Sequence, residues 1–169
     1  MSPTLTGLEP TWAANWVCGL SLIALTLALH AFGIAMIALA IARFDGRLRR
    51  RSSVPRAIMF TTTLIGTVGL ALACLHGIEA GIWGWAYLWL GAVSSISDAM
   101  LYSVDSITTR GASGLTLHAH WRMMGALEAA DGMLLFGTST AFLFAVMERI
   151  GRLAAQARKD RPVRRGHES

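Results

Sequence analysis

The sequence predicts an all-α membrane protein with three transmembrane helices and one short re-entrant helix. Of its 169 residues, 54% are hydrophobic and 15% are charged, and the mean hydropathy is +0.50, which is too apolar for a soluble domain of this size. Three apolar runs are each long enough to cross the hydrocarbon core of a bilayer, about 30 Å thick. A fourth, amphipathic stretch is too short to cross, so it is expected to enter and leave the membrane on the same side.

The basic residues predict the orientation of the chain. Lys and Arg gather after the first apolar run, in the loop 45–56, and after the last run, in the tail 149–169. By the positive-inside rule, both segments are expected in the cytoplasm. The N-terminal segment 1–11 has no basic residue and is expected outside. Because the basic clusters lie at helix ends, their expected partners are anionic lipid head groups, and nucleic acid is not expected.

The three spans are expected at 12–44, 57–90 and 119–148. The first is about 48 Å long as a helix, so it must tilt or project from the bilayer. The second follows Pro55, a residue suited to a first helical turn. Every Trp lies near a helix end that is expected outside, as an aromatic belt requires: Trp12, Trp16, Trp83, Trp85, Trp89 and Trp121.

The short helix and the loop after it are expected over 94–114. The run from Ser94 to Asp98 offers N-cap residues, apolar residues continue to Ile107, and Thr108 and Gly111 end the helix. A helix end at membrane depth is tolerated only where protein or water satisfies its backbone. Several copies of this loop around one axis would give that shelter.

Six segments in the second half of the chain carry a more specific pattern: His76-Gly-Ile-Glu79, Trp85 to Ala92, Ala99-Met-Leu-Tyr-Ser103, Thr108-Thr109, Trp121 to Gly132, and Leu134 to Phe144. In this order they resemble the small bacterial ion-channel proteins of the potassium-channel superfamily, in which two helices flank a pore helix and a selectivity filter. The resemblance implies a homotetramer around a central pore, in the bacterial inner (plasma) membrane. It also implies passive conduction of monovalent ions, with no other cofactor.

The filter itself departs from this family. The family reads Thr-Thr-Leu/Val-Gly-Tyr-Gly-Asp, and this chain reads Thr108-Thr109-Arg110-Gly111-Ala112-Ser113-Gly114. Ion coordination there depends on a ladder of carbonyls, and glycine permits the backbone angles it needs. Ser113 replaces the second glycine, and Ala112 removes an aromatic ring. We therefore expect a weakly selective cation pore, the alternatives being an anion-permeable pore or a non-conducting scaffold or sensor.

Arg110 bears directly on that choice, since four inward-pointing copies would repel cations. In the family this side chain points behind the filter, where the residue at position 105 also packs. We expect Asp105 to pair with Arg110 and keep a buried cation tolerable. The alternative is that Arg110 points to outer water. The resemblance makes Tyr102, Asp105 and Glu128 the filter support.

Two carboxylates in the third span, Glu128 and Asp131, lie three residues apart and hence close together on the helix. Intramembrane carboxylates are expected to be functional. We expect Asp131 to face the cavity below the filter and Glu128 to hold the pore helix, with the roles exchanged if the helix is rotated. Gly132 is the expected gate hinge, and close helix packing is the alternative.

His76 and Glu79 share a face of the second span. Two ligands are too few for a metal site, so we expect a hydrogen-bonded pair facing the pore helix, with proton sensing as a further role. His30 is expected to be an interhelical hydrogen-bond donor, and His118 and His120 are not expected to bind a metal. No nucleophile elbow, phosphate loop or four-ligand metal set occurs in the sequence, so an enzyme is not expected.

Overall fold

The computed structural model describes residues 9–48, 54–111 and 114–159, and every regular element in these ranges is helical. The elements are α1 (Glu9–Leu48), α2 (Val54–Trp89), α3 (Ile96–Ile107), a 3-10 turn η2 (Ala119–Trp121) and α4 (Arg122–Lys159). Three segments are long and apolar enough to cross a membrane: Trp12–Arg43, Met59–Trp89 and Ala119–Arg152. The all-helical class and the three candidate spans are therefore confirmed.

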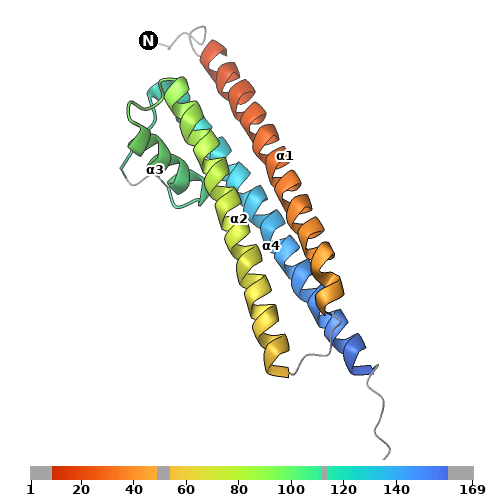
Figure 1. Ribbon diagram of the computed structural model, residues 1–169. Coiled ribbons are helices and arrows are strands. Elements are labelled where there is room, and N and C mark those ends of the chain that lie inside the picture. Colours follow the sequence, from red (N-terminus) through yellow and green to blue (C-terminus); the bar gives the residue numbers. More distant parts are fainter. Residues whose placement is uncertain (1–8, 49–53, 112–113, 160–169) are drawn as a thin grey trace, which may run out of the picture.

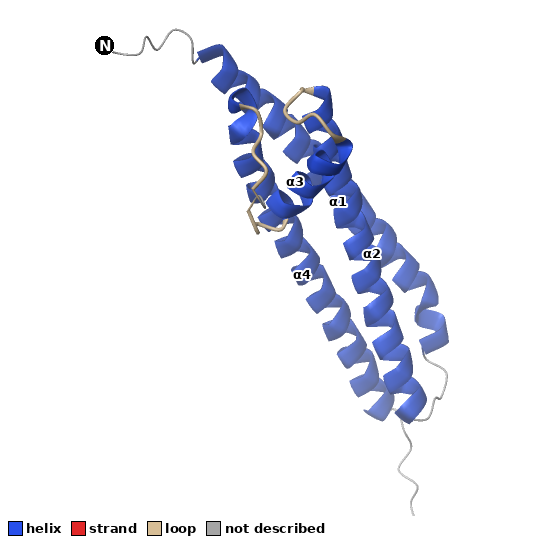
Figure 2. Ribbon diagram, turned by 90° about the vertical axis from the view of Figure 1, so that its left-hand side faces the viewer, coloured by secondary structure: helices blue, strands red, loops and turns tan. Residues whose placement is uncertain are grey.

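The three long helices form an elongated bundle, and α3 lies beside one end of it (Figure 1). α1 packs against α2 and α4, and α3 packs against the same two helices. Within the described residues α3 makes no packing contact with α1, so the two lie on different sides of the α2–α4 pair. The view from the side shows α3 against the half of the bundle that holds the start of α1 (Figure 2).

The helices are longer than the hydropathy pattern predicts. α1 begins before the expected residue 12, α2 begins at Val54, and α4 continues to Lys159 through the first part of the expected tail. α3 begins where a cap was expected, because the backbone N–H of Asp98 donates to Ser95 Oγ at 3.0 Å. Residues 49–53 of the basic loop and 160–169 of the tail lie outside the described ranges.

The polarity of the bundle is reversed relative to a soluble protein. Many large apolar side chains point outward, Val17, Phe32 and Leu70 among them. The buried set contains these polar or charged residues: Asn15, Thr26, His30, Glu79, Ser103, Asp105, Ser106, Glu128, Asp131 and Ser139. Apolar outer faces, with polar groups turned inward toward other helices, are what a lipid environment requires.

Two glycines of α4 let α3 approach it closely. A Cβ at Gly132 would collide with the backbone carbonyl group of Ile107, and a Cβ at Gly125 would collide with the Tyr102 phenol. Gly132 therefore has the close-packing role that was the alternative to a hinge. The helix runs through it without interruption.

We predict that Gly132→Ala lowers the free energy of unfolding by about 1–3 kcal/mol, the usual cost of overpacking, because the Ile107 backbone cannot rotate away as a side chain can. Gly137→Ala is the matched control on the same helix, since nothing lies within 4 Å of its added Cβ. The control should be neutral or stabilising by up to about 1 kcal/mol. Unfolding of the detergent-solubilised protein, followed by circular dichroism, measures both. An equal change in unfolding free energy for the two variants would contradict the close packing of Ile107 against Gly132.

Candidate functional site

The predicted filter begins at the inner end of α3. Thr108 closes the helix, its Oγ1 donating to the Val104 carbonyl at 2.6 Å. The backbone then enters the left-handed region at Thr109 (φ 57°) and Gly111 (φ 83°), and again at Gly114 (φ 81°). Thr109 is the only non-glycine residue of the described chain with a positive φ, a conformation that disfavours side chains. Ala112 and Ser113 lie outside the described residues.

Arg110 folds back toward α3, as predicted. Its guanidinium lies 3.3 Å from Asp105 Oδ1, and its backbone N–H donates to the Asp105 carbonyl at 3.0 Å. The carboxylate is 2% exposed but the Arg110 side chain is 70% exposed. The expected burial of Arg110 is thus wrong for the single chain, because the long side chain reaches Asp105 while its head stays at the surface. An ion pair this exposed contributes about 0–1 kcal/mol to the stability of the fold.

Glu128 connects three helices. The Tyr87 hydroxyl of α2 donates to Glu128 Oε2 at 2.6 Å, and Ser103 of α3 is hydrogen-bonded to Oε1. The Ser103 hydroxyl also lies 2.7 Å from the Ala80 carbonyl of α2. This geometry fits the predicted role of Glu128 in holding the short helix, through a side chain of α3.

Tyr102 of α3 packs against α2 and α4. Its ring meets the Tyr87 ring edge-on, with centroids 5.4 Å apart. Burial raises the pKa of the Tyr102 phenol above its usual value, so the group is neutral at physiological pH. Tyr102 thus supports α3 by packing.

Asp131 lies between helices and not on an open face. Its Oδ2 accepts hydrogen bonds from Thr26 Oγ1 of α1 at 2.6 Å and from Trp83 Nε1 of α2 at 3.0 Å, and the side chain is fully buried. The expectation that Asp131 faces a cavity is corrected by this placement. The reason is that α1 and α2 offer the strong donors, and an apolar bundle has few others.

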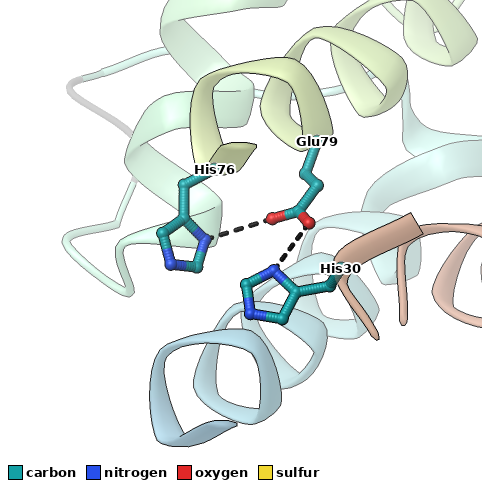
Figure 3. Close-up of side chains that lie close together, drawn as sticks. All are labelled: His30, His76 and Glu79. Carbon is teal, nitrogen blue, oxygen red and sulfur yellow. Dashed lines mark hydrogen bonds and ion pairs between the residues drawn. The ribbon is translucent and has the colours of Figure 1, made fainter. Parts of the chain in front are cut away.

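His76 and Glu79 lie side by side, as expected, but without the expected hydrogen bond between them, and their neighbours differ from those expected (Figure 3). Glu79 Oε2 lies 3.1 Å from His76 Nδ1, and Oε1 lies 2.8 Å from His30 Nδ1 on α1. Ser139 Oγ of α4 lies 3.0 Å from His30 Nε2 and 3.1 Å from His76 Nε2. The expectation that the pair faces the pore helix is therefore wrong, since its partners come from α1 and α4. The expected interhelical role of His30 is confirmed.

These contacts form one polar seam inside the bundle, which we define by its members: Thr26, His30, His76, Glu79, Trp83, Tyr87, Ser103, Glu128, Asp131 and Ser139. The α2 members follow one another at intervals of three or four residues, so they share one helix face. That spacing was the signal in the sequence that could have revealed the seam. Thr26 and Ser139 were not predicted, because single hydroxyl residues are common in transmembrane helices.

Comparisons with protein-family models, with curated proteins and with solved structures found no match for this chain. The channel resemblance therefore depends on the sequence pattern alone. The geometry of α3 and of the polar seam provides an independent basis for a function.

We predict that Glu128→Ala lowers the free energy of unfolding by about 1–3 kcal/mol, because it leaves the buried Tyr87 hydroxyl without its acceptor and removes one of the two partners of Ser103. Glu128→Gln should stay close to the wild type, since its amide offers an acceptor to Tyr87 and a donor to Ser103. Denaturant unfolding in detergent distinguishes the two. If both variants lose the same stability, the carboxyl group does not act through these hydrogen bonds.

Proposed function

We propose that the protein is a tetrameric ion channel of the potassium-channel type, in which the turn 108–114 forms the narrow part of a weakly selective cation pore. The observation that carries the proposal is the depth of the inner end of α3. Ile107 contacts Gly132, a residue well inside the candidate span Ala119–Arg152. A loop at that depth needs a water-filled or protein-lined surrounding.

The length of α3 supports a re-entrant path. Twelve residues make a helix of about 18 Å, well short of a bilayer core of about 30 Å. The helix starts near the end of α2, is capped there by Ser95, and stops against Gly132. The chain then returns to η2 at the same end of the bundle, where the His118 backbone N–H donates to the Ala92 carbonyl at 2.9 Å.

The electrostatics of the turn favour cations. The C-terminal end of a helix carries a partial negative charge, and the C-terminal end of α3 leads directly into Thr108 and Thr109. Both threonines are exposed in the single chain, with backbone carbonyls that could face an ion. Asp105 partly neutralises Arg110, which reduces the repulsion that four arginines would exert.

One chain cannot enclose a pore, so the proposal requires several copies. The surface around the turn is apolar, as contact with neighbouring subunits would require. The outward side chains of α3 include Met100, Leu101 and Val104, and those of α4 include Met133 and Phe136. Neighbouring subunits or lipid would cover these side chains. Four copies, as the family resemblance implies, would bring the four turns to one axis, with only monovalent ions as ligands.

The exposure of Arg110 supports a second candidate. A side chain that is 70% exposed can reorient, and four guanidinium groups at the axis would favour anions or block permeation. A non-conducting protein that serves as a scaffold or sensor would have the same single-chain structure. The anion pore differs from the cation pore in the charge of the ions that carry the current, and the non-conducting protein carries no current.

We predict cation-selective currents from the full chain reconstituted in planar bilayers, with a reversal potential in a KCl gradient on the side of the K⁺ equilibrium potential. Replacing KCl by NaCl on one side should shift that potential little. Cross-linking in the membrane should give a ladder that ends at four subunits. A reversal potential near that of Cl⁻ would favour the anion pore, and background flux would favour the scaffold.

Arg110→Gln should increase the cation current, because it removes a positive charge from the turn. Arg122→Gln is the matched control, since Arg122 is an exposed arginine at the start of α4 outside the proposed filter. An equal increase in both variants would mean that surface charge, and not the turn, sets the current.

A further inference from the structure

We propose that His30, His76 and Glu79 form a binding site for one divalent transition-metal ion, of which Zn²⁺ is the best match. We refer to these three residues as the His-Glu cluster. The three ligands come from α1 and α2 of a single subunit, so the inference does not depend on the proposed ion channel.

The donor atoms already converge. One ligand atom from each of the three residues lies within 4.8 Å of the other two, and the closest nitrogen–oxygen separations are 2.8 and 3.1 Å. Ligands about 2.0–2.1 Å from a tetrahedral zinc are roughly 3.3 Å apart. The two nitrogen–oxygen separations are already close to this value. The third separation is within 4.8 Å, so the side chains need to close in by at most about 1.5 Å to hold an ion. Two histidines and a glutamate, with a fourth position open, are a known zinc ligand set.

Ser139 has the position of an outer-shell partner. Metal-binding histidines usually donate the N–H of their other ring nitrogen to a fixed acceptor, which orients the ring. Ser139 Oγ lies 3.0 Å from His30 Nε2 and 3.1 Å from His76 Nε2, and a hydroxyl oxygen has two lone pairs. It can accept from both rings at once, which leaves both Nδ1 atoms free to bind the ion.

With Glu79 ionised and both histidines neutral, no choice of tautomers satisfies the cluster. If both rings carry hydrogen on Nε2, two Nδ1 lone pairs face the Glu79 carboxylate with no hydrogen between them. If one ring carries hydrogen on Nδ1 and the other on Nε2, one Nδ1 lone pair still faces the carboxylate. If both carry hydrogen on Nδ1, the single Ser139 hydrogen can serve only one Nε2. His76 Nδ1 and Glu79 Oε2 are also buried atoms that face each other without the alignment of a hydrogen bond. A metal ion resolves this conflict because it accepts lone pairs from all three residues.

The surrounding charge suits a divalent ion. Glu79 supplies one carboxylate, and the buried Asp131 is close enough to interact electrostatically with Glu79 and His30. Asp131 Oδ1 is buried and has no hydrogen-bond partner among the described residues. Two carboxylates match two positive charges, which lowers the cost of placing the ion inside an apolar bundle. Bound there, it would fasten α1 to α2 beside Ser139 of α4.

Metal titration of the full-length protein tests the site. Protein freed of metal by a chelator and held in nanodiscs should bind one Co²⁺ per chain, with the strong visible absorption of tetrahedral cobalt, and Zn²⁺ should displace it. Zn²⁺ should also raise the melting temperature, since a ligand of the folded state stabilises it. If neither Co²⁺ nor Zn²⁺ binds specifically to the wild-type protein, the proposal is overturned. The result would favour a cluster joined by hydrogen bonds without a metal ion.

Variants separate a metal site from a merely structural cluster. Glu79→Gln and His30→Gln should lose the cobalt absorption and the Zn²⁺-dependent rise in melting temperature. Ser139→Ala removes no ligand and should weaken metal affinity by about 10–100-fold, which keeps the test decisive if the ligand variants fail to fold. His118→Ala/His120→Ala is the matched control, because these histidines are exposed and lie outside the cluster; it should bind as the wild type does. Cobalt absorption lost in the control, or an unchanged cobalt affinity in Ser139→Ala, would count against the proposed site.

Discussion

The structure depends on satisfying polar groups that an apolar bundle buries. Three carboxylates, Glu79, Glu128 and Asp131, have no measurable exposure, although each lies in a segment that can span a membrane. In such surroundings an unpaired polar group costs several kcal/mol. Each carboxylate therefore needs partners on neighbouring helices, and those partners fix the rotation of every helix about its axis. Apolar contacts alone would leave that rotation loosely defined.

α1 is part of this arrangement and not only an additional anchor. Thr26 donates a hydrogen bond to Asp131 Oδ2, and His30 Nδ1 lies 2.8 Å from Glu79 Oε1. The helix also comes close to its neighbours at small residues, since a Cβ at Gly19 would strike Leu127 and one at Gly33 would strike Leu75. Removal of α1 would leave the polar face of α2 and α4 open to lipid, so the bundle of three helices is the smallest unit that buries the seam.

α3 is attached to the bundle by a different combination of contacts. Ser103 ties it to Glu128 and to α2, while the glycines at 125 and 132 let its backbone lie close to α4. The described part of the turn after α3, residues 108–111, is exposed and is held by local contacts, among them the Asp105–Arg110 ion pair and backbone hydrogen bonds to Asp105 and Ser106. A helix packed against α2 and α4 and followed by an exposed turn fits the proposed pore, which other copies of the chain would complete.

The sequence by itself determined the three candidate spans, the short capped helix and the Asp105–Arg110 pair, because hydropathy, capping and contacts five residues apart are local properties. It also indicated the supporting role of Glu128, through the family resemblance. Only the tertiary structure decided that Asp131 meets Thr26 and Trp83, that His30 and Ser139 join Glu79, and that Gly132 packs against Ile107. The physical reason is that the long helices expose apolar side chains on several sides, so the sequence pattern marks no single inner face. Residues up to 109 positions apart meet only when the helices have been placed and rotated against one another.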